Sequence, residues 1–199
     1  DLSRAFDMFR SKIRSLMASD RRAEQVAGSF AVEVLGKRLL SCPVAFADSW
    51  RRYSIGLRET QSADLGEVQA ARRSLHEETG DDREAEARGA HAARTVGAWL
   101  KPFADRLDAE KSAIDSVLRS LGLDMTDDSG GELTPRNDAR FDALFKLIED
   151  ALLGHPDERL VVFTEYKTTL DYLERRLGSL YAEDGFVRVL FGGMGDEER

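Results

Sequence analysis

Apolar residues recur at steps of three and four along most of the first 121 residues, and this spacing limits the possible folds more than any other feature. The first stripe consists of Leu2, Ala5, Phe6, Phe9, Ile13, Leu16 and Met17. Because an α-helix turns once in about 3.6 residues, the stripe predicts a helix with one apolar side. Similar stripes predict helices over about 22–41, 43–57 and 84–121, with Pro43 opening one and Pro102 dividing another. We expect the first three helices to pack as an antiparallel unit.

The pattern changes in the last third of the chain. Residues 124–136 have the composition of a loop, and a helix is predicted over about 138–153. Two short, continuous apolar runs follow, at 160–164 and 187–191, as expected of parallel strands that are covered on both faces. A helical stripe over about 167–181 separates them, so the order predicts one right-handed βαβ unit.

The predicted fold class is mainly α, a helical bundle-like region followed by a small α/β (βαβ) unit. The chain divides into a helical region at 1–123, a linker at 124–137 and the α/β unit at 138–199. The polar, acidic stretch 59–90 is interpreted as a solvated helix or mobile linker, with a binding tail as the alternative. Since the first residue is Asp and not Met, we expect an internal piece of a longer protein.

Charge is distributed unevenly along the chain. The formal net charge is −8, but residues 1–58 carry 11 Lys and Arg against 6 Asp and Glu. A net acidic chain is not expected to coat DNA, whereas a basic first third suits a surface that faces a polyanion. Arg51 and Arg52, next to Trp50, are therefore candidate nucleic-acid contacts. The alternative is a solvated helical face.

The remaining chemistry excludes several classes of protein. Cys42 is the single cysteine, so no internal disulfide forms, and we expect a reducing, cytoplasmic setting and a buried, inert thiol. His76, His91 and His155 lack the spacing of metal ligands, so no metal site is predicted. There is no signal peptide and no apolar run of the ~18 residues that a membrane span needs, so no membrane partner is expected.

Four stretches carry a resemblance to a known family. They are Ala31-Val-Glu-Val-Leu-Gly-Lys-Arg-Leu-Leu-Ser-Cys-Pro-Val-Ala-Phe-Ala47, Arg159-Leu-Val-Val-Phe-Thr-Glu-Tyr-Lys-Thr-Thr-Leu-Asp-Tyr-Leu173, Val187-Arg-Val-Leu-Phe-Gly-Gly-Met194 and Asp196-Glu-Glu-Arg199. The first resembles the helical region between the lobes of bacterial superfamily-2 helicase-like ATPases of the SWI/SNF type. The others resemble the opening of the C-terminal RecA-like lobe of these ATPases. The resemblance implies that 1–123 is an inter-lobe insert and that 138–199 is a truncated α/β RecA-like lobe.

The resemblance also implies a function. The parent protein would be a nucleic-acid-dependent ATPase, a helicase or translocase that uses ATP and Mg and acts on DNA. No catalytic residue and no bound cofactor are expected in this fragment, which we predict to be inactive alone. Gly36-Lys37 is not a phosphate loop, because that motif needs Gly where the chain has Ala31 and Ser or Thr where it has Arg38. Asp157-Glu158 precedes a predicted strand and so is not the metal-binding acid pair.

In the family, the loop after the first strand of this lobe and the turn after the second lie near the nucleic-acid backbone. The matching residues here are Thr164, Glu165, Tyr166, Lys167, Gly192, Gly193 and Met194. A hydroxyl, a lysine and glycine N–H groups suit phosphate oxygens, and ligands of open α/β sheets bind at the carboxyl ends of strands. The alternative is that the glycines permit a tight turn and that Tyr166 only packs.

Two further interpretations stay open. Residues 1–150 alone would form a helical protein-interaction module with no motor activity. A role in phage defence rests on analogy with SWI/SNF-type helicases found there. The apolar strands 160–164 and 187–191 also predict a homodimer through their exposed edges, where unpaired N–H and C=O groups would pair between copies.

Overall fold

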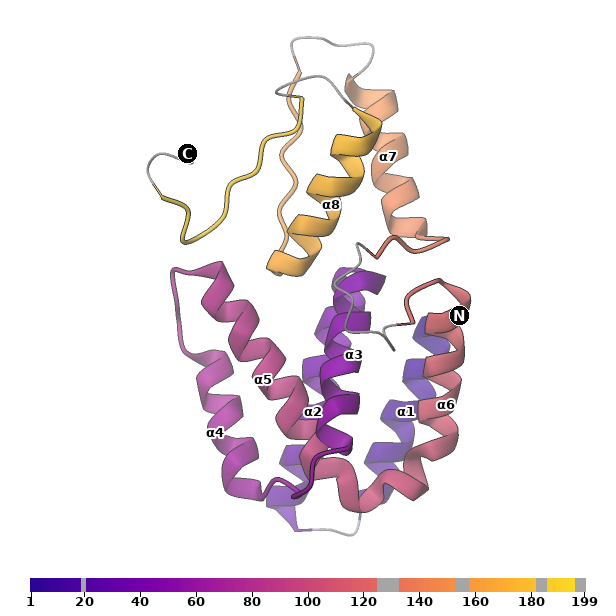
Figure 1. Cartoon of the computed structure of the whole chain (residues 1–199), viewed down its shortest axis with the longest axis vertical. Helices are drawn as coiled ribbons and strands as arrows, with labels where there is room; N and C mark the ends of the chain where they lie inside the picture. The colour runs from indigo at the N-terminus through magenta and orange to yellow at the C-terminus, as the bar shows by residue number, and fades with distance from the viewer. Residues whose placement is uncertain (19–20, 125–132, 153–157, 182–185, 196–199) are drawn as a thin grey trace.

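The computed structural model describes residues 1–18, 21–124, 133–152, 158–181 and 186–195. Helices α1 to α6 form one body, and α7 and α8 lie together at one end of it (Figure 1). The helices in chain order are α1 (Leu2–Leu16), α2 (Arg22–Ser41), α3 (Pro43–Leu57), α4 (Leu65–His76), α5 (Asp82–Leu100), the short 3-10 helix η1 (Lys101–Phe103), α6 (Ala104–Ser120), α7 (Ala139–Leu152) and α8 (Lys167–Leu180).

The first three helices confirm the prediction from apolar spacing. Helix α1 buries the predicted stripe, and the Asp1 carboxylate caps it by accepting the Ser3 N–H at 3.0 Å. Such a cap satisfies a donor that the first turn of a helix leaves without a partner. Pro43 stands at the start of α3, and η1 with Pro102 separates α5 from α6, as the two prolines predicted.

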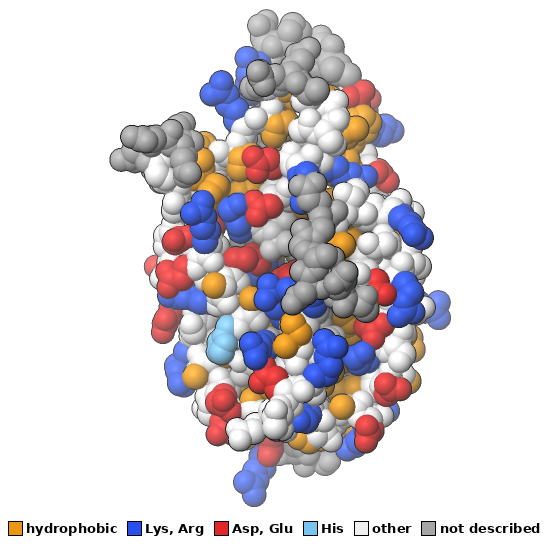
Figure 2. Space-filling model, viewed as in Figure 1, with side chains coloured by type: hydrophobic (Ala, Val, Ile, Leu, Met, Phe, Trp, Pro, Cys, Tyr) orange, Lys and Arg blue, Asp and Glu red, His pale blue; other side chains and the backbone are white. Residues whose placement is uncertain are grey.

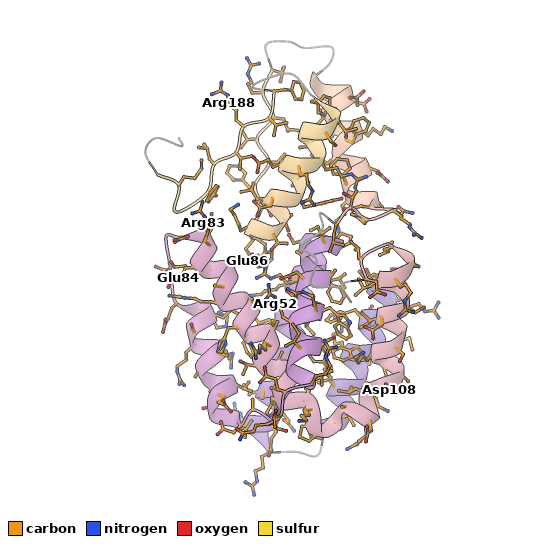
Figure 3. The ribbon with its side chains drawn as sticks, in the orientation of Figure 1. Arg52, Arg83, Glu84, Glu86, Asp108 and Arg188 are labelled. Carbon is orange, nitrogen blue, oxygen red and sulfur yellow. The ribbon has the colours of Figure 1, made fainter. Side chains whose placement is uncertain are left out.

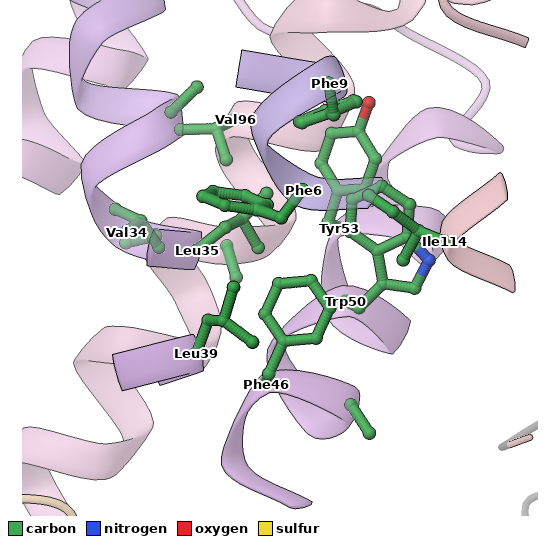
Figure 4. Packing of buried hydrophobic residues seen from close by; sticks show 14 of the residues in the cluster. Phe6, Phe9, Val34, Leu35, Leu39, Phe46, Trp50, Tyr53, Val96 and Ile114 are labelled. Atoms are coloured by element: carbon green, nitrogen blue, oxygen red, sulfur yellow. The ribbon is translucent and has the colours of Figure 1, made fainter. Parts of the chain in front are cut away.

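An aromatic cluster forms the centre of the helical body. Phe6 of α1 meets Phe46 of α3, and Phe9 of α1 meets Trp50 and Tyr53 of α3 (Figure 4). The Phe9 and Trp50 rings lie edge to face with centroids 5.1 Å apart, and Trp50 stacks on Tyr53 at 4.8 Å. The buried indole N–H of Trp50 donates to Asp115 Oδ1 at 2.7 Å, so the cluster also binds α6. Trp50 is therefore a core residue.

Helices α3 and α5 pack with their backbones almost in contact. A Cβ built on Gly56 would overlap the carbonyl oxygen of Arg94, and one built on Gly97 would overlap that of Tyr53. Only glycine permits this approach at both positions. Helix α5 also packs against α2 and α8.

The predicted α/β unit is wrong. No β-strand occurs among the described residues, although α8 forms where a helix was expected. Residues 158–166 and 186–191 run as elongated stretches without regular structure (Figure 1), and no backbone hydrogen bond joins them in the described part of the chain. An apolar run indicates an extended chain, but a strand also needs a neighbour that pairs with its N–H and C=O groups. Among the described residues neither run has such a neighbour, so the structure there does not contain the truncated RecA-like βαβ unit.

Two other predictions have mixed outcomes. The stretch 59–90 contains α4, whose Asp64 and Glu67 form a reciprocal capping box, so part of it is a helix and not a linker. Residues 125–132, most of the predicted 124–137 linker, lie outside the described residues. Asp157, the His155 ring and the expected helix start at Asp196 lie outside them too. The division into domains therefore stays a prediction.

Candidate functional site at the junction of α2, α5 and α8

A buried arginine joins three helices that are far apart in the sequence. Arg38 of α2 is 4% exposed, and its Nη1 lies 2.6 Å from Oε1 of Glu86 on α5. Its guanidinium also lies 4.0 Å from the centre of the Tyr166 ring, just before α8. Gly89 leaves room for the guanidinium, because a Cβ there would overlap it. Figure 3 shows Glu86 near the end of α5 that faces α8.

Hydroxyl and thiol groups at the end of α2 also contact α8. The Ser41 and Thr169 hydroxyls lie 2.6 Å apart, and the Cys42 sulfur lies 3.4 Å from the Thr169 hydroxyl. Cys42 also accepts the Ala45 N–H at 3.3 Å and so caps α3. Burial raises the pKa of the Cys42 thiol, which keeps it protonated. The prediction that this thiol is buried is confirmed.

Asp138 ties α7 to α8 in the same region. This carboxylate is 4% exposed; Oδ1 accepts the N–H groups of Arg140 and Phe141, and Oδ2 accepts the Tyr172 hydroxyl at 2.8 Å. Burial raises the pKa of Tyr172. Arg140 Nη1 donates to the Leu39 carbonyl at 2.7 Å, which connects α7 to the end of α2. Charged and polar groups thus hold α7 and α8 on the helical body.

An open cavity of about 370 Å³ lies between these elements. Its wall combines apolar side chains such as Leu40, Phe141 and Val162 with Cys42 and Thr169. The polar groups of this wall already have partners, and the described residues contain no group of three or more potential metal ligands. The described wall of the cavity therefore combines apolar contact surface with hydrogen-bonded polar groups.

The first predicted turn, from Thr164 to Lys167, leads directly into α8. The Thr164 hydroxyl accepts the Tyr166 N–H at 3.5 Å, and Glu165 is exposed. Tyr166 is half-buried beneath the arginine, and burial raises its pKa to about 12. Lys167 forms an ion pair with Asp171 of the next helical turn. The packing interpretation of Tyr166 therefore fits its surroundings, and Thr164 keeps an accessible side.

The second predicted turn, Gly192 to Met194, lies against the start of α5. The Gly192 N–H donates to Asp82 Oδ2 at 2.7 Å, and its carbonyl accepts the Asp82 N–H at 3.2 Å. Gly193 has a φ of +87°, which favours glycine, and it sits beside the Asp81 carboxylate. The Met194 sulfur accepts an N–H within its own turn. The Gly192 N–H expected to face a phosphate thus serves a carboxylate here.

The two turns lie at the same place in the structure. Lys167 Nζ is 4.2 Å from the centre of the Phe191 ring, and the Arg83 guanidinium is 5.3 Å from it on α5. Asp82 and Glu86 of α5 line the same side. The resulting surface is mixed in charge, with Lys167 and Arg83 as cations beside the Asp82 and Glu86 carboxylates.

Arg51 and Arg52 are not part of this junction. Both pair with Asp48 one turn away on α3, each at 3.5 Å. Arg51 follows Cys42 by nine positions, which is about 14 Å along a helix at 1.5 Å per residue. The predicted contacts therefore form two separate sets, and Arg51 and Arg52 have a neighbouring carboxylate that offsets part of their charge.

Sequence reasoning missed the groups that organise the junction. The sequence pattern assigns Arg38 no partner, and it places Glu86 in the acidic stretch 59–90. A charged residue on the apolar side of a predicted helix was the available signal for Arg38, since such a residue is buried only when it is paired.

Comparisons of the chain with protein-family models, with curated proteins and with solved structures found no match. Within the described part of the chain, no helix has the length and apolar character that a membrane crossing requires.

Proposed function

We propose that the chain is part of a nucleic-acid-dependent ATPase of the SWI/SNF type that acts on DNA in the cytoplasm. One observation carries the proposal. The two regions that resemble this family, 31–47 and 159–194, are more than 100 residues apart in sequence and contact each other directly. Arg38 packs on Tyr166, and Ser41 bonds to Thr169, within these regions.

In this proposal the helical body holds the start of α8 in a defined place. Glu86 accepts the Thr168 N–H and Ser41 bonds to Thr169, and these two hydrogen bonds hold the first turn of α8. A nucleic acid that contacts Thr164 or Lys167 would then be held in a fixed position relative to the helical body. The proposal does not require a sheet in residues 158–191.

ATP and Mg would bind to parts of the parent protein other than these 199 residues. The chain has no phosphate-loop motif, and groups that neutralise the γ-phosphate are required for its transfer. We expect no ATP turnover by this chain with or without duplex DNA. ATP turnover that survives repurification would contradict this part of the proposal.

Binding to duplex DNA tests the proposal. Anisotropy of a labelled duplex would be measured at two salt concentrations, and affinity should fall steeply with salt because bound cations release counterions. The double variant Arg51→Ala, Arg52→Ala should weaken binding more than the matched pair Arg72→Ala, Arg73→Ala, which is exposed on α4. Absence of binding at low salt would refute the proposal.

A helical protein-interaction module is the second candidate, and a specific observation favours it. Val161, Phe163 and Leu190 are 69%, 92% and 73% exposed, which is unusual for large apolar side chains. Apolar side chains also gather on the surface of the upper part of the molecule (Figure 2). A partner protein that covers them, with no DNA binding by the chain, would favour this candidate.

A further inference from the structure

Another open cavity, of about 420 Å³, lies between α7 and α8. Its described wall contains two adjacent arginines of α8, Arg175 and Arg176, and the hydroxyl side chains Thr134 and Ser179. Cavities of roughly 300–1,000 Å³ are typical of small-molecule sites. Guanidinium and hydroxyl groups that line one cavity offer hydrogen-bond donors to an anion. The wall therefore favours a negatively charged ligand.

Existing contacts hold the Arg176 side chain in place. Its guanidinium carbon lies 3.7 Å from the centre of the Phe141 ring. Its Nη1 donates to the Tyr172 hydroxyl, which in turn donates to the buried Asp138 carboxylate. A guanidinium carries five N–H donors in a planar fork, so one that is oriented by such contacts can also bind an anion. Orientation before binding lowers the entropy that the ligand's arrival costs.

The neighbouring arginine connects α8 to the segment that precedes α7. Arg175 Nη2 donates to the Leu133 carbonyl at 3.0 Å, and Thr134 is the next residue in the chain. This contact brings the Thr134 hydroxyl to the same wall as the two guanidinium groups.

One carboxylate, Asp142, lines the described part of this cavity. Its Oδ1 lies 4.0 Å from Arg176 Nη2, and its side chain is 64% exposed, so solvent screens the pair. With two arginines against one aspartate, the described wall has a net charge of +1. Asp142 thus reduces the attraction for an anion without cancelling it.

These donors suit a phosphate monoester better than a carboxylate. A phosphate monoester carries a charge of about −1.5 to −2 at pH 7 and three strong acceptor oxygens, and guanidinium forks match phosphate oxygens. A carboxylate has one charge and two oxygens and would use fewer of the donors. Phe145 and Leu180 line the same cavity and offer apolar surface to an organic substituent.

We propose that this cavity binds a phosphate monoester, with its phosphate at Arg175 and Arg176 and its substituent against Phe145 and Leu180. Two sources present this chemistry, a free small ester and the terminal phosphate of a nucleic-acid strand. The inference does not rest on the proposed nucleic-acid function, because a free ester would bind in the same way.

Titration with phenyl phosphate, followed by NMR of the isotope-labelled chain, tests the site. The signals of Arg175 and Arg176 should shift on binding. Arg175→Gln should weaken binding about tenfold, because a charge-assisted hydrogen bond is lost. Lys146→Gln is the matched control and should leave the affinity unchanged, since Lys146 is an exposed cation of α7 that does not line the cavity. Circular dichroism would verify that every variant is folded.

Asp142→Asn gives the sharpest result, because removal of the neighbouring negative charge should strengthen binding about threefold. A folding defect would not produce such a gain. Benzoate, a carboxylate with the same ring, should bind more weakly than phenyl phosphate.

Competition separates the two sources. An oligonucleotide that displaces phenyl phosphate only when its 5′ end is phosphorylated would support the strand end as the source. Displacement by neither form would support a free ester. Equal displacement by both forms would show binding of internal phosphates and overturn the proposal for a monoester.

Three further outcomes would overturn the proposal. Phenyl phosphate causes no shift at Arg175 and Arg176, or benzoate binds as tightly as phenyl phosphate, or the affinity is unchanged in both Arg175→Gln and Asp142→Asn.

Discussion

Arg38 is a buried charged residue, and burial of a charge without a partner is strongly unfavourable. It is 4% exposed and depends on Glu86, which is only partly buried, and on the face of Tyr166. Removing one partner of a buried ion pair leaves an uncompensated charge, whereas an exposed pair contributes little. The contrast can be tested within one helix, because Lys37 forms an exposed pair with Glu33.

We expect Arg38→Ala to lower the free energy of unfolding by about 3 kcal/mol, since Glu86 loses its partner and Tyr166 loses the group that covers it. Lys37→Ala should change it by less than about 0.5 kcal/mol. Urea denaturation followed by circular dichroism measures both. Equal losses for the two variants would contradict the importance given to the buried pair.

Cys42 provides a second test at this scale. Because burial raises its pKa, the folded thiol stays protonated at pH values where the unfolded thiol ionises. Its contribution to stability is thus present below the unfolded pKa and is lost as the pH rises above it. Labelling with a thiol reagent at pH 8 should be slow in the native chain and fast in urea. Equal rates would show that the thiol is accessible.

At the scale of elements, the spacing of apolar residues and the positions of prolines correctly predicted helices whose formation depends on nearby residues. The stripe of Leu2 to Leu16, Pro43 and Pro102 correctly placed helices and their ends, because apolar spacing and the missing proline N–H act within one turn. The apolar runs at 160–164 and 187–191 do not form strands among the described residues. A strand needs a neighbouring strand, and the sequence of a run does not show whether such a neighbour is present. The contacts of Arg38 also involve residues distant in sequence, Glu86 and Tyr166. The sequence therefore showed a charged residue on the apolar side of a helix but not its partners.

The close contact of α3 and α5 gives a prediction for one glycine. In most helix positions Gly→Ala stabilises, but a methyl group at Gly97 would overlap the Tyr53 carbonyl and force the two helices apart. We expect Gly97→Ala to cost about 1–3 kcal/mol. Gly178→Ala on α8, where nothing lies within 4 Å, should instead stabilise by about 0.5–1 kcal/mol. Thermal unfolding of both variants gives the signs, and the same sign for both would refute the packing argument.

At the scale of the whole molecule, the helical body α1 to α6 and the pair α7 and α8 are held by apolar and by polar contacts. An aromatic and aliphatic cluster around Phe9, Trp50 and Tyr53 holds α1, α3 and α6. Helices α7 and α8 add Phe141 and Tyr172 to this buried cluster, and polar contacts such as Ser41–Thr169 and Arg140–Leu39 also join them to the body. Polar contacts contribute less net free energy than buried apolar surface, so the second part should open at lower cost than the first.

Hydrogen exchange would reveal this difference. We expect amides of α7 and α8 to exchange with a lower opening free energy than those of α1 and α3, because local unfolding begins where few apolar contacts must break. Arg38→Ala should accelerate exchange in α8 and in the adjoining end of α5 while amides in the middle of α1 keep their protection. Lys37→Ala serves as the matched control and should change neither. If Arg38→Ala accelerated exchange equally in α1 and α8, the two parts would unfold as one cooperative unit, and Arg38 would stabilise the whole fold and not the position of α8.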